Sequence, residues 1–232
     1  KKLNSFVNLD GVLLFQPQNI FYFTNAEFYF TNHDGIFFYD FSKPEFFTSR
    51  MVRPISWIKP KIIEKIDDVL SLIRGNVGID DIPLALYKKI CKKAKPINIS
   101  NNLNDMRVIK SKYEINMLRK SCKISEKVLE KGLSEIDENM SEFEFKGLLE
   151  FYMNKFGTEP SFQTIVACGS HIATPHHKPS GKKLHEPILI DFGVRYHGYC
   201  SDITRTIGSK YEKTFKKILE NIECELKPDS KA

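Results

Sequence analysis

The stretch Ile188-Leu-Ile-Asp191-Phe-Gly-Val-Arg-Tyr-His-Gly198-Tyr-Cys-Ser-Asp202-Ile-Thr-Arg-Thr206 organises the rest of the chain. Apolar residues alternate with other residues on both sides of Gly198, which is the period-2 pattern of a β-hairpin. The pair His197-Gly198 predicts a tight turn, because both central residues of such a turn have positive φ. A turn centred on Tyr196-His197 is the alternative.

With either turn, Asp191 and Asp202 project from one face of neighbouring strands, opposite the apolar face. Cross-strand Cβ atoms on one face lie roughly 4.5 to 8 Å apart, so two carboxylates there repel each other. A shared proton, a basic partner or divalent metal ions could offset this repulsion. A solvated hairpin face is the plain structural alternative. Because Asp is depleted in strands, two such residues on one face point to a functional site, for which metal ions are the preferred explanation.

Composition limits the classes of protein to consider. A chain of 232 residues can form one large domain or two modest ones. The net charge of +6 is spread through lysine-rich segments, so nucleic-acid binding is not indicated. Five cysteines without a C-x-x-C pair predict free thiols in a reducing cytoplasm. No apolar run has membrane-spanning length and no signal peptide is visible, so no membrane partner is expected; Lys1 is not expected to be the natural start.

The amino-terminal part alternates strand and helix patterns. Short apolar runs separated by turn residues predict a meander of strands at residues 11–15, 20–24, 35–39 and 44–48. Helical spacing follows at residues 60–74 and 83–94, with short strands at 77–79 and 97–99. This alternation predicts an α/β domain, which a polar linker at residues 101–105 ends.

Two capping boxes open the second part. Ser111 with Glu114 and Ser141 with Glu144 predict helices that run to about residues 133 and 156. The side chains expected in the core are Ile115, Leu118, Cys122 and Leu129 in the first helix and Phe145, Leu148, Leu149 and Tyr152 in the second. A strand at residues 162–168 and a last amphipathic helix at residues 211–222 complete this part.

Histidines crowd beside the aspartate pair. Five of the six lie between residues 171 and 197: His171, His176, His177, His185 and His197. A lone histidine is usually a packed or surface residue, but crowding beside carboxylates favours a metal or acid–base site. We expect His185 and His197 to face solvent, whereas His176 and His177 lie between two prolines and suit a positioned hydrogen-bond donor.

Three segments together resemble the Xaa-Pro dipeptidase (prolidase) and aminopeptidase P family of pita-bread metallopeptidases. They are Arg107-Val-Ile-Lys-Ser-Lys-Tyr-Glu114, Thr174-Pro-His-His177, and the hairpin with its Ile-Thr-Arg-Thr206 ending. Asn19-Ile-Phe-Tyr-Phe-Thr24 resembles the amino-terminal domain of that family. The resemblance implies an amino-terminal α/β domain, residues 1–103, and the first half of an α+β pita-bread catalytic domain, residues 104–232.

The resemblance also implies a site and an activity. Asp191 and Asp202 match the two aspartates of a dinuclear site that usually holds manganese or cobalt, and His176 matches a histidine that hydrogen-bonds substrate. The implied reaction is hydrolysis of Xaa-Pro bonds in dipeptides or peptide N-termini by metal-activated water. A proline-containing peptide is the implied substrate, in a cytoplasmic homodimer.

Two departures from the family pattern qualify this expectation. The loop from His176 to Asp191 is shorter than is usual in the family, which leaves His177 as an alternative to His176. The remaining family ligands, one histidine and two glutamates, have no counterpart among Glu212, Glu220, Glu223 and Glu225. We therefore expect these 232 residues alone to bind metal weakly or not at all and to be inactive.

Other family relationships predict other functions. A creatinase-like amidinohydrolase is disfavoured because both aspartates are present, and a methionine aminopeptidase because of the extra domain before residue 100. The alternative from another class is a non-catalytic, peptidase-like binding module, similar to domains of some histone chaperones.

Overall fold

A computed structural model describes residues 8–27, 35–50, 56–137, 139–208 and 216 of the chain. The chain forms two compact units, Lys1–Ser111 and Lys112–Ala232, and each is described by itself. Within the described residues, no helix combines the length and the apolar content needed to cross a bilayer.

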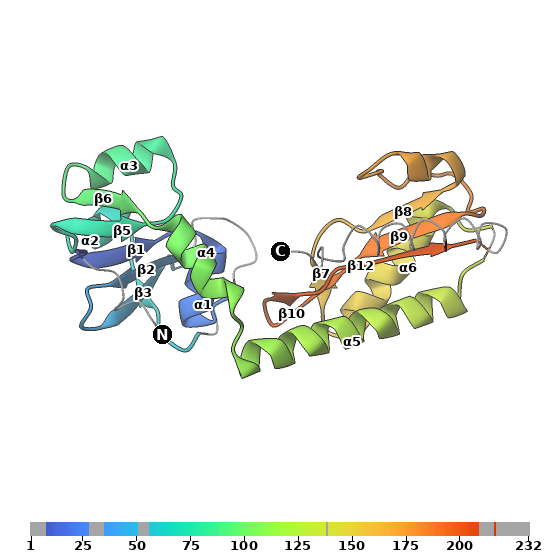
Figure 1. Ribbon diagram of the computed structural model, residues 1–232, viewed down its shortest axis with the longest axis horizontal. Coiled ribbons are helices and arrows are strands. Elements are labelled where there is room, and N and C mark those ends of the chain that lie inside the picture. The colour runs from blue at the N-terminus through green and yellow to red at the C-terminus, as the bar shows by residue number, and fades with distance from the viewer. Residues whose placement is uncertain (1–7, 28–34, 51–55, 138, 209–215, 217–232) are drawn as a thin grey trace, which may run out of the picture. The chain divides into compact units, whose positions relative to one another are not determined.

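A six-stranded mixed sheet in the order β4-β3-β2-β1-β5-β6 forms the first unit (Figure 1). The neighbours β1, β2 and β3 pair antiparallel as a meander, whereas β1, β5 and β6 pair parallel. The strands are β1 (Gly11–Leu14), β2 (Gly35–Tyr39), β3 (Pro44–Thr48), β4 (Lys61–Ile62), β5 (Asn76–Ile79) and β6 (Lys95–Asn98).

Helices cover this sheet, and they are α1 (Pro17–Thr24), α2 (Ile66–Leu70), α3 (Leu84–Ile90) and α4 (Ser100–Val108). Alternate residues of β1 enter two different apolar clusters, Leu13 on one face and Val12 and Leu14 on the other. Because both faces of a central strand are buried in this way, its sequence is a continuous apolar run rather than an alternating one.

The strand predicted at residues 20–24 is wrong, because that segment belongs to helix α1. Aromatic residues favoured a strand, but Pro17 occupies the first helical turn, where its missing N–H is not needed. The buried carboxylate of Asp80 accepts the N–H groups of Phe15 and Gln16, each at 2.9 Å, and the amide of Asn19 at 2.9 Å. These long-range hydrogen bonds stabilise the start of α1 and override the local propensity.

Two further predictions in the first unit need correction. Residues 60–74 do not form one helix, since β4 pairs parallel with β3 at the sheet edge and α2 begins only at Ile66. Residues 101–105 are not a linker but part of α4. The polar pattern of that segment hid Leu103, which is 2% exposed and packs into the core beside the sheet.

The second unit carries two three-stranded sheets, in the orders β12-β9-β8 and β11-β10-β7. Its strands are β7 (Glu159–Pro160), β8 (Ile165–Cys168), β9 (Ile188–Phe192), β10 (Val194–Tyr196), β11 (Tyr199–Cys200) and β12 (Ile203–Ile207). Its helices are α5 (Lys112–Ser134), α6 (Glu142–Lys155) and the short 3₁₀ helix η2 (Gly169–Ala173). Figure 1 shows α5 running along the strands of this unit.

Helix α6 begins as predicted. The Ser141 hydroxyl accepts the Glu144 N–H, and the Glu144 carboxylate accepts the Ser141 N–H, which completes the capping box. Phe145, Leu149 and Tyr152 of α6 are buried against the apolar residues of β8 and β9.

The buried face of α5 differs in part from the predicted one. Leu129 is half-buried and packs against the core, and Leu118 is half-buried, but Ile115 is 39% exposed and Cys122 is exposed. The fully buried positions hold Glu114, Met117, Ser121, Ser125, Val128 and Gly132. Small residues let the helix approach the hairpin closely, and the Ser121 hydroxyl donates to the Val194 carbonyl at 2.9 Å. The helix predicted at residues 211–222 lies outside the described residues.

Candidate functional site

The hairpin has the turn that the sequence predicts at residues 197 and 198. His197 has a φ of 48° and Gly198 a φ of 77°, the positive values of a tight two-residue turn. Tyr196 pairs with Tyr199 across this turn, and further along Asp191 pairs with Thr204. Both pairings share one register, which makes Asp191 and Asp202 diagonal neighbours on one face.

The face that carries Asp191 is the one turned away from the helices. Ile188, Ile190 and Phe192 are buried in the core beside α6, whereas Leu189 and Asp191 alternate with them and are half-buried. Asp202 follows β11 and is exposed. The alternation therefore separates a packing face from a face that is accessible to ligands.

Ordinary strand pairing is interrupted between the two aspartates. The Ser201 hydroxyl accepts the Val194 N–H at 3.0 Å and lies 2.6 Å from the Ser125 hydroxyl of α5. Gly193 is required here, because a Cβ at this position would overlap the Ser201 carbonyl oxygen and the Ser161 hydroxyl. This buried serine network fixes the backbone on both sides of Asp202.

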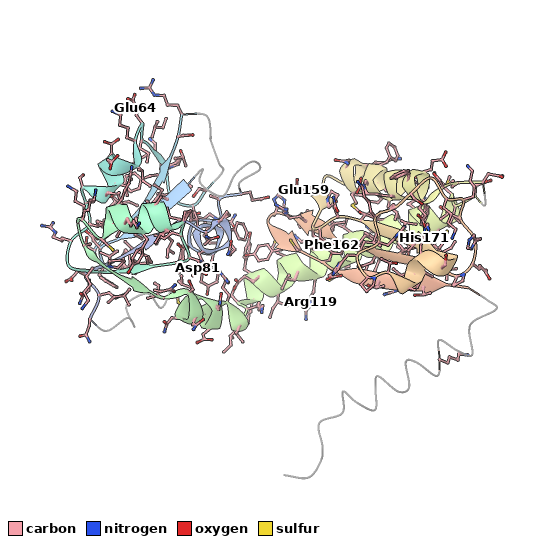
Figure 2. All side chains as sticks on the ribbon, turned by 90° about the horizontal axis from the view of Figure 1, so that it is seen from above. Glu64, Asp81, Arg119, Glu159, Phe162 and His171 are labelled. Carbon is pink, nitrogen blue, oxygen red and sulfur yellow. The ribbon has the colours of Figure 1, made fainter. Side chains whose placement is uncertain are left out.

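Asp191, Asp202 and His176 line one cavity of about 510 Å³. The structure therefore brings together the three residues that the sequence singled out. Apolar walls come from Phe143 and Phe162, the latter labelled in Figure 2 within the second unit. Concave sites with apolar walls and a few convergent polar groups are typical of ligand binding.

The charge on the aspartate pair has no basic partner among the described residues, since neither carboxylate forms an ion pair there. Lys146 lines the same cavity but pairs with Glu150 of its own helix at 2.8 Å. Thr204 donates a hydrogen bond of 2.9 Å to Asp191 Oδ1. Two oxygen donors on one cavity wall, one of them oriented by a hydroxyl, fit a hard or borderline divalent cation.

A second polar cluster, which the sequence analysis missed, surrounds Glu142 at the start of α6. Its side chain is fully buried. Oε1 accepts His171 Nδ1 at 2.8 Å and the Cys168 N–H at 2.9 Å. Oε2 accepts His177 Nε2 at 3.0 Å, together with the Ser180 N–H at 2.9 Å and the Ser180 hydroxyl at 2.7 Å. Figure 2 labels His171, which lies in the second unit.

Hydrogen bonding determines the charge state of Glu142. Burial by itself raises the pKa of this carboxyl, but the hydrogen bonds from His177, Ser180, His171 and the Cys168 N–H outweigh burial and lower the pKa well below its usual range. Glu142 is therefore an ionised, buried carboxylate. The only sequence signal for it was an acidic residue in the first turn of a helix, where negative charge is favourable.

The five crowded histidines thus separate into three groups. His171 and His177 bind Glu142, and His176 lines the cavity in an exposed position with a φ of 54°. His177 also lines this cavity, but its Nε2 is engaged by Glu142. His185 and His197 are exposed, which confirms their predicted position at the surface.

Comparison with known proteins identifies relatives of this chain. Residues 116–224 match the model of Metallopeptidase family M24. The chain is 31% identical to an Xaa-Pro dipeptidase of Pyrococcus horikoshii over 233 residues, covering 92% of this chain and 65% of that protein. It is 36% identical over 152 residues to an uncharacterized peptidase of Methanocaldococcus jannaschii, covering 64% of this chain and 43% of that protein.

Solved structures agree with these relatives. The prolidase from Pyrococcus horikoshii superposes with a TM-score of 0.80 at 27% identity, covering 91% of this chain and 65% of that one. An X-Pro aminopeptidase from Thermotoga maritima gives a TM-score of 0.78 at 25% identity, covering 91% of this chain and 67% of that one. The chain spans about two thirds of the length of these structures and 43 to 65% of the two curated relatives.

Proposed function

The chain belongs to Metallopeptidase family M24, within the prolidase and aminopeptidase P group, and on that premise we propose that its complete gene product is a metal-dependent Xaa-Pro exopeptidase. The observation that carries this proposal is the position of Asp191 and Asp202, which line one cavity together with His176. A plain solvated hairpin gives no reason for two carboxylates that lack a basic partner among the described residues to share a cavity with a histidine.

Asp191 and Asp202 are the residues that would hold two divalent ions, with manganese or cobalt as the proposed metals. When bound, such a pair polarises the scissile carbonyl and activates a water molecule as the nucleophile. Thr204 restrains the orientation of Asp191 through its hydrogen bond of 2.9 Å. His176 donates a hydrogen bond to the oxygen that becomes negative in the transition state, and Phe143 and Phe162 supply apolar contact surface for the substrate in the cavity.

Two carboxylates supply too few ligands for tight binding of two ions. We therefore propose that the 232 residues alone bind metal weakly and do not hydrolyse peptides. We further propose that residues 1–103 are an amino-terminal α/β domain and residues 104–232 the first half of a pita-bread domain. The compact units divide between Ser111 and Lys112, just after α4, so the exact boundary stays a prediction.

The finer properties of the protein are also proposals. A preference for proline rests on the relatives named as Xaa-Pro dipeptidase and X-Pro aminopeptidase. The cytoplasm is the proposed compartment, since Cys91, Cys122, Cys168 and Cys200 are free thiols. We propose a homodimer on the basis of the family resemblance alone.

An assay of the complete gene product with Mn²⁺ or Co²⁺ tests the activity. The substrate is an Xaa-Pro dipeptide, and the same two residues in reverse order serve as the specificity control. We expect Xaa-Pro cleavage that Asp202→Asn abolishes and that Glu126→Gln, an exposed change on α5, leaves intact. Failure of the metal-loaded product to cleave either dipeptide would instead favour a non-catalytic binding module.

A further inference from the structure

Glu142 differs from every residue so far assigned to the proposed reaction, because it does not line the cavity and yet is a fully buried charge. Burying an ionised carboxylate is unfavourable unless hydrogen bonds satisfy it. Five donors do so here, and all belong to one segment, from Cys168 at the end of β8 to Ser180. The carboxylate is therefore the point at which this segment is fixed to α6.

The donors flank the proposed catalytic histidine. His171 precedes His176 in the chain, whereas His177 and Ser180 follow it, so one carboxylate holds the segment on both sides of His176. The backbone reinforces this attachment, since the Glu142 N–H donates to the Lys182 carbonyl at 3.0 Å and the Phe143 N–H to the Ser180 carbonyl at 3.1 Å.

The backbone of His176 itself calls for such restraint. Its φ of 54° lies in the left-handed region, which non-glycine residues occupy only where the surroundings over-determine them. The side chain of His176 is exposed at the cavity, so packing does little to hold it. Its position depends on the segment ends that Glu142 fixes.

A metal ion is the competing interpretation of the same cluster, because the ligand atoms of Glu142, His171 and His177 lie within 4.8 Å of one another. A carboxylate offers about four lone-pair sites, and the five donors already occupy them. His171 Nδ1 and His177 Nε2 also lie at hydrogen-bond distance from the carboxylate oxygens. The geometry therefore favours a hydrogen-bonded anchor over a cation site.

We propose that Glu142 is a positioning residue that fixes His176 at the cavity by anchoring His171, His177 and Ser180. This inference rests on the proposed peptidase function for its kinetic consequence, but not for its structural one. An ionised carboxylate only accepts hydrogen bonds, so His171 carries its proton on Nδ1 and His177 on Nε2.

Nitrogen-detected NMR of the imidazole rings tests the anchor without reference to activity. In the wild-type protein we expect an Nδ1–H tautomer for His171 and an Nε2–H tautomer for His177, together with slow amide exchange at Cys168 and Ser180. Glu142→Gln introduces a donor and should mix both tautomers and speed both exchange rates. Glu144→Gln is the matched control, since it removes a carboxylate from the same helical turn. The Glu144 carboxylate contacts Ser141 and not the histidines.

The opposite tautomers in the wild-type protein would overturn the proposal, and this measurement needs no variant. The metal interpretation would replace it if stoichiometric Zn²⁺ removed the N–H signals of both His171 and His177. If His171 and His177 each kept the wild-type tautomer in Glu142→Gln, that result would also contradict the anchor.

Kinetics on the metal-loaded complete gene product test the link to His176. We expect Glu142→Gln to lower kcat about 10- to 100-fold with little change in KM, because a small displacement of a transition-state contact has an effect of that size. The double variant with His176→Ala should be no slower than His176→Ala alone. Independent, multiplying effects of the two changes would overturn the proposal.

Two outcomes separate this proposal from the proposed function. If the wild-type product shows the expected tautomers but no Xaa-Pro cleavage, the peptidase proposal fails and the anchor stands. If it cleaves Xaa-Pro bonds but shows other tautomers, the anchor fails alone.

A second variant applies if Glu142→Gln prevents folding. His171→Ala removes one half-buried donor to Glu142 and should also lower kcat. An unchanged kcat in that variant would count against the anchor.

Discussion

Asp191 of β9 lies directly opposite Thr204 of β12, and the Thr204 hydroxyl donates a hydrogen bond of 2.9 Å to Asp191 Oδ1. The shared register of the hairpin makes Asp202 the diagonal neighbour of Asp191 on the same face. One carboxylate is therefore oriented within the sheet while the other lies exposed at the interruption of the strands. This relationship makes the pair a candidate metal site rather than part of the hairpin's packing.

Removing one charge of the pair should stabilise the metal-free protein. Like charges on neighbouring strands repel, so we expect Asp202→Asn to raise the free energy of unfolding by about 0.5 kcal/mol in the presence of a chelator. Urea denaturation followed by circular dichroism measures the change. A loss of stability in this variant would mean that Asp202 serves the fold and not a ligand.

Gly193 should not tolerate a side chain. Its Cβ would overlap the backbone carbonyl of Ser201, which cannot rotate away, so we expect Gly193→Ala to lower the free energy of unfolding by about 2–4 kcal/mol. Gly181→Ala is the matched control, because no atom lies within 4 Å of the added Cβ. Equal stability of the two variants in urea denaturation would contradict the close approach described here.

The Ser201 hydroxyl should contribute both to stability and to the site. Ser201→Ala leaves the buried Val194 N–H without its acceptor, which costs about 1–3 kcal/mol. Ser134→Ala, at an exposed hydroxyl of α5, should change stability by less than about 0.5 kcal/mol. If the network also positions the neighbouring Asp202, Ser201→Ala weakens Mn²⁺ binding by the complete gene product, and calorimetry measures that effect.

Acid should remove the contribution of Glu142. Because the folded-state pKa is lowered, the stabilisation is fully present above the unfolded-state pKa of about 4.3 and is lost as the pH falls below it. His171, His177 and the Cys168 thiol are titratable side chains that contact this carboxylate, and burial raises the pKa of the thiol. Between pH 7 and pH 5, wild type should exceed Glu142→Gln in stability by a nearly constant margin.

Below about pH 4.3 that margin should narrow, by up to about 1.4 kcal/mol per pH unit. Urea denaturation at a series of pH values measures both proteins under the same conditions. A margin that stays constant down to pH 3 would show that Glu142 is not the ionised anchor inferred here.

The hairpin could be predicted because its signals are local. Alternation set which side chains share a face, and His197-Gly198 set the turn and hence the register. The strand predicted at residues 20–24 failed for the opposite reason, since the start of α1 is stabilised by Asp80, which lies far away in sequence. The buried face of α5 was misjudged because close packing against the hairpin selects Ser121, Ser125 and Gly132 rather than large apolar residues.

The candidate site could be predicted only in part. His176, Asp191 and Asp202 carry the family motifs and line one cavity, but what they bind stays a prediction. Glu142 was missed because its significance lies in partners that only the folded chain brings to it. The adjacent capping box also explained the acidic residues of that segment without a further role.

Titration of Mn²⁺ into the complete gene product, followed by calorimetry, tests the central claim that Asp191 and Asp202 hold the metal. We predict binding by wild type and by the Glu126→Gln control. Asp191→Asn and Asp202→Asn should each weaken it by at least about 100-fold, since even changes that act on metal ligands indirectly typically lower affinity 10- to 100-fold. Unchanged Mn²⁺ affinity in both aspartate variants would contradict the account.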